Sequence, residues 1–335
     1  MPQVRRQGRA PGRDPTLSLG PLALAAAAAA VPRPLREVRL VMGTTAEVRA
    51  ELPPAGAAAA MDAAFAALQR VDRRMSLWHE SELVALNRDG EARLSAETAE
   101  VLAHALDVAE ASAGAFDPTL EPLLRARGAY GGPATALTDA ETARLRAAVG
   151  WRRVRFDRAT RQVRLAPGSG LDLGGIAKGY AADLALRALR RAGARSGLVD
   201  LGGSSLGSFG LPLEVALRDP EAPAGEPWGS FQAGGASVSS SGGEERPGHI
   251  LDPRSGEPAV AALAATVVAR TGIEADALST AACVLGAERG LALLVRRGAA
   301  GLVLVREQGL PGVRTTPGFA ARYGLELRPG VRALP

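Results

Sequence analysis

The sequence predicts an α+β fold with mixed sheets and packed helices. The chain has 335 residues, of which 47% are hydrophobic and 22% charged, a globular composition that can bury a large core. Segments with helical spacing and segments with strand alternation follow one another without a regular βαβ order. The chain contains no internal repeat, which argues against a solenoid.

The first half of the chain is expected to hold two strands followed by helices. Residues 36–52 alternate as strands do and break at Met42-Gly43-Thr44-Thr45. Residues 56–75 and 95–112 have helical spacing, and Ser95 opens the second helix with Glu97 nearby as a cap. A loop and a further short helix starting at Thr138-Asp139 are expected within 126–150.

The second half is expected to be richer in strands. The segments, in order, are a hairpin over 154–165, a helix from about 175 to 192, a strand over 197–203, several strands within 213–270, a long helix over 273–298 and a buried strand over 300–307.

Residues 1–35 are interpreted as a signal-like or disordered extension, and residues 36–335 as the folded domain. A basic start with Arg5 and Arg6 precedes an apolar run over 16–31, which resembles a Sec or Tat-like export signal. A mobile extension or a mis-set start codon is the alternative. The sequence thus predicts an exported, periplasmic or cell-envelope protein, with a cytoplasmic location left open. Because no Cys follows the apolar run, a lipid anchor is not supported.

The composition argues against nucleic acid as a partner and against zinc. The formal charge is +5, but basic and acidic residues are interspersed and only 4% of residues are aromatic. A single Cys, Cys283, cannot form an intrachain disulfide, and with three His it does not make a typical zinc site. Any metal is therefore expected to have oxygen ligands, as Mg²⁺ and Ca²⁺ do.

Lys178, in LDLGGIAKGYAAD (171–183), is the only lysine in the chain. The segment is interpreted as a strand that runs through a Gly pair into a helix, whose free N–H groups suit a phosphate. Lys178 is expected in the first turn, where a cation opposes the helix dipole unless an anion lies nearby. The alternative is a solvated lysine beside a glycine turn.

Two further segments carry candidate site residues. Asp276 and Thr280 are four residues apart and share a helix face, which suits Mg²⁺, although an Asp near a helix start is more often a cap. His249, in the turn-rich GHILDPRSGEP, is a candidate general base or a structural hydrogen-bonding residue. Asp117 and Asn87 are interpreted as loop-capping or ligand-binding residues.

Six segments in this order resemble the motifs of the ApbE family, the FAD:protein FMN transferases, over about residues 38–305. They are MGTT, MSLWHESELVALN, GAFDPTLEPLL, LDLGGIAKGY, HILDPRSG and ADALSTA. The resemblance implies an ApbE-like flavin transferase fold and an enzyme with FAD as substrate and Mg²⁺ as cofactor. Such an enzyme transfers FMN to a Thr or Ser hydroxyl of an acceptor protein and releases AMP.

The resemblance also implies roles for individual residues. His249 would accept the proton of the acceptor hydroxyl, and Lys178 would lie close to the phosphates or orient the metal site. The main-chain oxygen of Ala177 would join Asp276 and Thr280 as metal ligands. The residues implied to contact the flavin nucleotide are Met42, Trp78, Asp117, Tyr180 and Leu251.

The resemblance also implies alternative functions and a partner protein. The same residues would serve a Mg²⁺-dependent FAD pyrophosphatase, and a non-catalytic FAD-binding protein is expected to have lost Asp276, Thr280 or His249. The family's acceptors carry a Ser/Thr-Gly-Ala-x-Ser/Thr segment, which this chain lacks, so the expected acceptor is another protein, such as a membrane redox-complex subunit or an exported flavoprotein. Ser204 stands where the family usually has Asn, which leaves flavin packing and acceptor recognition open.

Overall fold

The computed structural model describes residues 34–131, 136–220, 222, 224–242 and 249–335. The predicted extension therefore lies outside the described residues, apart from its last two. A contact division of the chain places residues 34–335 in one unit.

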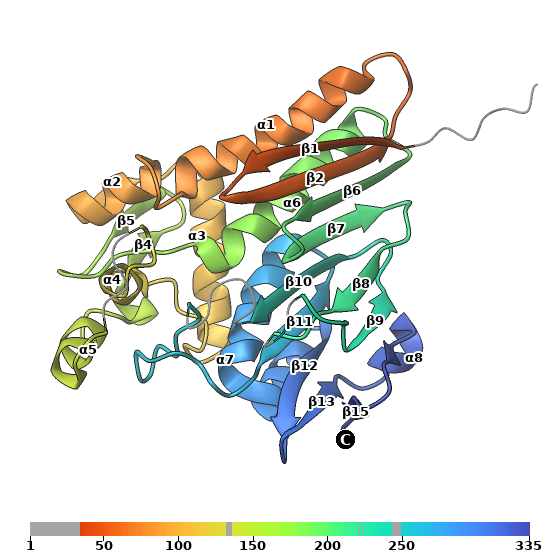
Figure 1. Cartoon of the computed structure of the whole chain (residues 1–335). Coiled ribbons are helices and arrows are strands. Elements are labelled where there is room, and N and C mark those ends of the chain that lie inside the picture. Colours follow the sequence, from red (N-terminus) through yellow and green to blue (C-terminus); the bar gives the residue numbers. More distant parts are fainter. Residues whose placement is uncertain (1–33, 132–135, 221, 223, 243–248) are drawn as a thin grey trace, which may run out of the picture. The chain divides into compact units, whose positions relative to one another are not determined.

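A nine-stranded sheet forms the centre of this unit (Figure 1). Its order is β1-β2-β6-β7-β10-β11-β12-β13-β15, and only the β13–β15 pair is parallel. The strands are β1 (Leu35–Val41), β2 (Thr44–Glu51), β6 (Ser196–Leu201), β7 (Ser205–Phe209), β10 (Ser237–Gly242), β11 (Ala264–Ala269), β12 (Ala300–Glu307), β13 (Leu310–Thr315) and β15 (Arg332–Ala333).

Two three-stranded sheets flank the large one. The first has the order β14-β9-β8, with β8 (Glu214–Leu217), β9 (Gly229–Gln232) and β14 (Glu326–Leu327). The second has the order β3-β5-β4, with β3 (Glu91–Arg93), β4 (Arg155–Asp157) and β5 (Gln162–Arg164).

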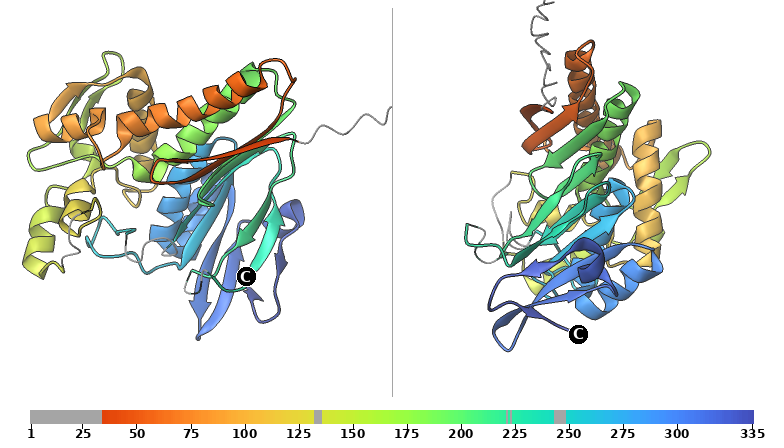
Figure 2. Two further views of the ribbon diagram at one scale, coloured as in Figure 1. Left: turned by 45° about the horizontal axis from the view of Figure 1, so that its top comes forward. Right: turned by 90° about the vertical axis from the view of Figure 1, so that its right-hand side faces the viewer.

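Helices cover one face of the large sheet, as the right-hand view of Figure 2 shows. The described residues form the helices α1 (Ala57–Met75), α2 (Glu82–Asp89), α3 (Ala96–Ala111), α4 (Glu121–Ala126), α5 (Asp139–Arg146), α6 (Gly174–Arg191), α7 (Gly272–Arg296) and α8 (Phe319–Tyr323), with a 3₁₀ turn, η1, at Trp151–Arg153. Of these, α1, α6 and α7 contact the covered face. Helix α6 packs between α1 and α7, and α7 lies along β10, β11 and β12.

The inner strand β11, next to the central strand β10, explains why the core has two parts. All six of its residues are buried, because helices cover one face and the β14-β9-β8 sheet covers the other. Val267 packs into the cluster under the helices, and Val268 into the cluster that holds Trp228 and Phe231. Among the described residues only α7 is long and apolar enough to cross a membrane, and more than half of its apolar window is buried inside this core.

The predicted α+β class is confirmed, and most predicted segments lie within two or three residues of the observed ones. Three local expectations were wrong. Residues 171–173 are not a strand, and Lys178 is the fifth residue of α6, beyond its first turn. The cap of α3 is Ser95 alone, which accepts from the Thr98 N–H, while Glu97 bonds to Arg70.

Candidate functional site

The chain enters α6 through a main-chain segment that is held by other side chains. The Asn87 amide donates to the Leu171 oxygen (2.8 Å) and accepts from the Leu171 N–H (2.7 Å). Asp172 accepts from the Gly174 N–H at the start of the helix and from the Tyr130 hydroxyl (2.7 Å). These contacts replace the strand that the sequence predicted here.

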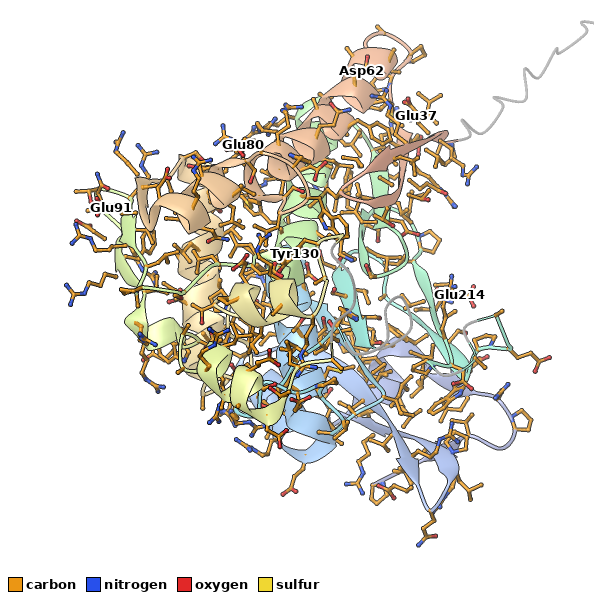
Figure 3. All side chains as sticks on the ribbon, turned by 60° about the vertical axis from the view of Figure 1, so that its left-hand side comes forward. Glu37, Asp62, Glu80, Glu91, Tyr130 and Glu214 are labelled. Atoms are coloured by element: carbon orange, nitrogen blue, oxygen red, sulfur yellow. The ribbon has the colours of Figure 1, made fainter. Side chains whose placement is uncertain are left out.

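Tyr130 and Trp78 lie beside this entry. Tyr130 is at the centre of the view in Figure 3, and its ring meets Trp78 edge to face with 6.3 Å between the centroids. Burial, and then the negative charge of Asp172, raises the pKa of the Tyr130 phenol, so it stays a hydrogen-bond donor. Trp78 keeps 56% of its surface exposed, which leaves a large aromatic face at the surface. Tyr130 and Asp172 were not predicted as site residues.

Helices α6 and α7 touch through glycine main chain. A Cβ on Gly179 would lie 2.0 Å from the Gly272 oxygen, and a Cβ on Gly272 would lie 2.3 Å from the Gly179 oxygen. Real side chains do not approach so closely, so glycine is required on both helices. This contact brings the 175–179 turn of α6 against the first turns of α7.

The Asp276 carboxylate lies in this crossing. Its Oδ2 accepts from the Gly179 N–H (2.9 Å) and its Oδ1 from the Ser239 hydroxyl (2.9 Å), with Ser205 at 3.5 Å. The residue is only 4% exposed, and burial raises the pKa of the carboxyl, which the charge of Lys178 opposes. An ionised Asp276 therefore depends on a nearby cation.

Lys178 and Thr280 complete the cluster. The Lys178 ammonium donates to the Ser204 hydroxyl, and the Thr280 hydroxyl lies 3.1 Å from the Ser241 hydroxyl. A Cβ on Gly175 would lie 3.1 Å from Thr280 Oγ1, so α6 passes directly beside this residue. The structure thus brings together four of the predicted residues, Ala177, Lys178, Asp276 and Thr280.

The donor set of this crossing fits a hard divalent cation. It offers a carboxylate, hydroxyl oxygens and the buried main chain around Ala177, and oxygen is the ligand type that Mg²⁺ prefers. No group of three His, Cys, Asp or Glu side chains suited to a metal occurs in the part of the chain that the structure describes. Ser205, Ser239 and Ser241, which come from β7 and β10, were not predicted.

His249 and Leu251 lie on a separate loop. His249 is exposed, and Leu251 is buried and pairs with Pro258 in an isolated bridge. The turn between Leu251 and Pro258 is closed by hydrogen bonds from the Ser255 and Gly256 N–H groups to the main-chain oxygen of Asp252. Arg127, beyond the end of α4, donates to the Gly256 oxygen (3.0 Å) and thereby fixes this turn.

Met42 occupies the tight turn between β1 and β2. Its φ of 56° and the φ of 70° at Gly43 are both left-handed, as a two-residue hairpin turn requires. Gly202, two residues before Ser204, donates to the Thr45 oxygen (2.9 Å). The turn that carries Met42 is therefore tied to the segment that holds the Lys178 ammonium.

The polar groups of Asp117 and Tyr180 have partners inside the protein. Asp117 accepts from the Thr119 N–H (2.9 Å), the Thr119 hydroxyl (2.6 Å) and the Trp151 N–H (3.1 Å), which favours the loop-capping interpretation. The Tyr180 hydroxyl donates to Glu100 of α3 (2.7 Å), and burial together with this bond raises its pKa. Tyr180 thus directs its hydroxyl to α3, away from the carboxylate of Asp276.

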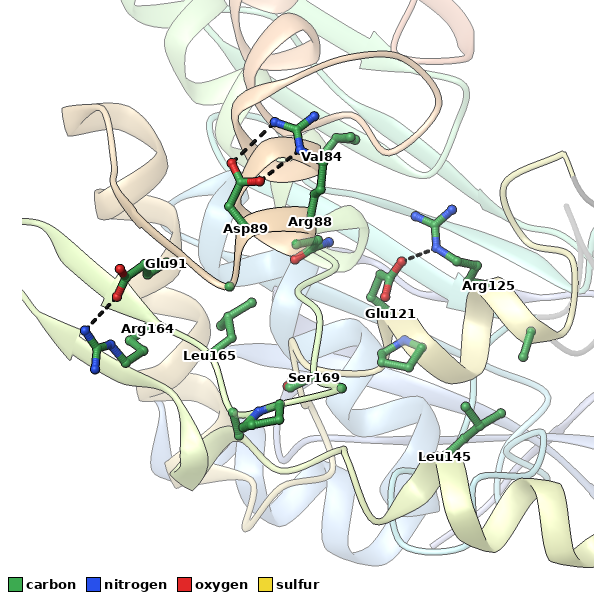
Figure 4. A pocket seen from close by; sticks show the side chains of 17 residues that line it. Val84, Arg88, Asp89, Glu91, Glu121, Arg125, Leu145, Arg164, Leu165 and Ser169 are labelled. Carbon is green, nitrogen blue, oxygen red and sulfur yellow. Dashed lines mark hydrogen bonds and ion pairs between the residues drawn. The ribbon is translucent and has the colours of Figure 1, made fainter.

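A cavity of about 890 Å³ lies between α2, α4 and the segment 164–169 (Figure 4). Its charged lining residues are paired with one another, as Glu121 with Arg125 and Glu91 with Arg164. Of the candidate site residues, Asn87 alone lines it.

The fold and the site define an α+β protein in which an oxygen-donor cluster, an ammonium and the main chain of the first turns of a helix meet at one crossing. The chain belongs to the ApbE family, whose model matches residues 42–303.

Individual relatives agree with this assignment. The chain is 31% identical over 308 residues to the FAD:protein FMN transferase of Rhodobacter capsulatus, which covers 85% of this chain and 58% of that protein. It is 34% identical over 301 residues to the FAD:protein FMN transferase of Treponema pallidum, covering 78% of this chain and 82% of that protein. The chain thus spans less than two thirds of the first relative and most of the second.

Solved structures have the same fold. The flavinyl transferase ApbE of Pseudomonas stutzeri, in its apo form, superposes with a TM-score of 0.73 at 29% identity, covering 88% of this chain and 99% of that chain. The predicted family, the flavin transferase fold and the prediction of an enzyme are confirmed.

Proposed function

We propose that this chain transfers the FMN half of FAD to a Ser or Thr hydroxyl of another protein, forming a phosphoester and releasing AMP. The observation that supports this function is the convergence of Lys178 from α6 with Asp276 and Thr280 from α7 at one glycine-lined crossing. The relatives are named FAD:protein FMN transferases, and these names supply FAD, FMN and a protein acceptor for the proposal.

The proposed cofactor is Mg²⁺, held by the Ala177 main-chain oxygen, the Asp276 carboxylate and the Thr280 hydroxyl. When bound, such a cation neutralises charge on the pyrophosphate of FAD and so favours attack at phosphorus. Asp276 is suited to this role because its carboxylate is buried at the crossing among hydroxyl groups, and because burial raises its pKa while nearby positive charge opposes that shift.

The remaining steps are assigned to this chain's own residues. His249, exposed on its loop, takes the proton from the acceptor hydroxyl as the oxygen attacks the FMN phosphorus. The bond from that phosphorus to the bridging oxygen breaks, and the oxygen leaves with AMP. Lys178, held by Ser204, places an ammonium where charge develops on the phosphate oxygens.

The flavin nucleotide is proposed to lie along the surface between Met42, Trp78 and Leu251. Trp78 offers an exposed aromatic face and Met42 lies in a turn tied to the Ser204 segment. Asp117 and Tyr180 are also proposed to lie near the nucleotide, although their polar groups bond to Thr119, Trp151 and Glu100.

The proposed acceptor carries a Ser/Thr-Gly-Ala-x-Ser/Thr segment and belongs to an exported flavoprotein or a membrane redox complex. The export proposal rests on the signal-like sequence of residues 1–35. A fusion of residues 1–40 to a reporter that is active only after export tests it, and a reporter that stays in the cytoplasm would argue against export.

One experiment separates transfer from the alternatives. The purified chain is incubated with FAD, Mg²⁺ and a peptide that carries the acceptor segment, and the peptide mass and the nucleotides are both measured. Transfer adds one FMN to the peptide for each AMP released. Equal amounts of free FMN and AMP with an unmodified peptide would favour a pyrophosphatase, and intact FAD would favour a binding protein.

A further inference from the structure

Each of the helices α6 and α7 has an aspartate whose carboxylate accepts hydrogen bonds from the main chain of the other helix. Asp276 of α7 accepts from the Gly179 N–H of α6, as described above. In the opposite direction, Asp183 of α6 accepts from the Gly272 N–H (2.7 Å, Oδ1) and the Ile273 N–H (3.1 Å, Oδ2) of α7. The proposed reaction gives Asp276 a role but leaves Asp183 without one.

Asp183 supplies the N-terminal cap of α7 from another helix. Thr271, the N-cap residue of α7, makes no side-chain cap hydrogen bond of its own. The first N–H groups of a helix need acceptors, and a negative charge there also interacts favourably with the helix dipole. The bidentate contact fixes two successive main-chain groups of α7, and therefore the rotation of α7 about its axis as well as its position.

Because α6 and α7 meet through glycine main chain, the hydrogen bonds from α7 to Asp183 are important for the geometry of the site. No side chain separates the two helices at Gly179 and Gly272, so packing alone sets the distance between them but does not set how α7 rotates. Asp276 lies one helical turn beyond Gly272, and Asp183 lies about one turn beyond Gly179. The two carboxylates therefore link the same pair of turns: Asp276 of α7 bonds to α6, and Asp183 of α6 bonds to α7.

We propose that Asp183 is a positioning residue for the cation site: it fixes the first turns of α7 on α6 and so keeps the Asp276 carboxylate close to the Ala177 main chain. The inference rests on the proposed role of Asp276 as a metal ligand. Asp183 does not touch the cation or the nucleotide. Residues that orient metal ligands typically change metal affinity by about 10- to 100-fold when they are replaced.

The test is a titration of the full chain with Mn²⁺ alone, in which the electron paramagnetic resonance signal of the free ion measures binding. Asp183→Asn keeps the size of the side chain but leaves one α7 N–H facing an amide NH₂ instead of an acceptor. Asp183→Glu keeps both acceptor oxygens but displaces them by one methylene, and it serves if the Asn variant does not fold. Ser95→Ala is the matched control, because it removes the N-cap of α3, which bears no proposed ligand.

We expect Asp276→Ala to abolish binding, both Asp183 variants to weaken it by about 10- to 100-fold, and Ser95→Ala to leave it within about twofold. Wild-type affinity in a folded Asp183 variant, with binding still lost in Asp276→Ala, would overturn the role of Asp183 and leave the proposed site in place. Equal binding by the wild type and Asp276→Ala, or no binding by either, would overturn the metal site itself and the inference with it.

Discussion

The side-chain amide of Asn87 makes both hydrogen bonds that a neighbouring strand would make to the main chain of Leu171. The Nδ2 group donates at 2.8 Å and the Oδ1 atom accepts at 2.7 Å. Through this pair α2 fixes the segment that turns into α6, and with it the glycines and Lys178 that follow. Asn87, the only asparagine of the chain, therefore acts as a structural residue for the site.

Replacing Asn87 with Ala is expected to lower the free energy of unfolding by about 2–4 kcal/mol, because two main-chain groups of the buried Leu171 lose their partners. Urea unfolding measures the change. Arg88→Ala is the control, since its exposed ion pairs contribute nothing measurable. An Asn87→Ala protein as stable as the wild type would refute this role.

The glycine contact between α6 and α7 predicts an unequal effect of two alanine substitutions. At Gly179 the new methyl group meets the Gly272 main chain, and we expect a loss of more than about 3 kcal/mol of stability. At Gly207 the methyl group meets the end of the Leu186 side chain, which can move, so the loss is expected to be smaller. Thermal and urea unfolding of both variants measure this, and equal losses would show that the contact is not rigid.

Lys178→Arg is expected to lower kcat/KM for transfer about tenfold, or about 1.4 kcal/mol, with little change in stability. The reason is geometric, since a planar guanidinium does not fit a place where a compact ammonium reaches Ser204 and lies near Asp276. Arg191→Lys, at the exposed end of the same helix, is the control and should transfer normally. Full activity of Lys178→Arg would mean that only the charge matters.

The raised pKa of the buried Asp117 carboxyl predicts that the stability of the protein depends on pH. Burial raises its pKa, while hydrogen bonds from Thr119 and Trp151 oppose the shift. Because its pKa is higher in the folded chain than in the unfolded chain, the stability that this group contributes is present below the unfolded pKa and is lost as pH rises through the folded pKa. The stability of the wild type relative to Asp117→Asn should therefore fall as pH rises above about 4.

Asp157→Asn is the control for this measurement and should show the opposite slope. Hydrogen bonds from Thr160 and Ala159 lower the pKa of Asp157, so its contribution is present at neutral pH and is lost as pH falls. Chemical unfolding at a series of pH values gives both slopes. If the stability of the wild type relative to Asp117→Asn rose with pH, that result would contradict the burial argument.

Sequence patterns predicted those parts of the fold that depend on local alternation and capping. The break at Met42-Gly43 is a hairpin turn, and Thr138 with Glu141 forms the capping box of α5. The strand expected before Gly174 was wrong, because its hydrogen-bonding partner is the side chain of Asn87, 84 residues away in the sequence. Local spacing carries no information on such a partner.

For the site, too, local sequence patterns predicted some residues and missed those whose partners are distant in the sequence. The spacing of Asp276 and Thr280 on one helix predicted the cation ligands that are proposed above, and the segment around Lys178 predicted the proposed phosphate side. Ser205 and Ser239 were not recognised as site residues, because they reach Asp276 of α7 only through the order of the sheet. The contact of Asp183 with α7 was not predicted either, because it depends on the crossing of the two helices. Asp172 had a local signal, since it lies two residues before Gly174, whose N–H it accepts.

The most direct test of the account is the rate at which FMN is attached to an acceptor peptide by the wild type and by Asp276→Ala, with FAD and Mg²⁺ in excess. Asp157→Ala, which removes an aspartate in the distant β4–β5 turn, is the matched control. The account predicts that Asp276→Ala is folded but slower by about a thousandfold or more, with Asp157→Ala unchanged. A folded Asp276→Ala protein that transfers FMN within a few-fold of the wild-type rate would contradict it.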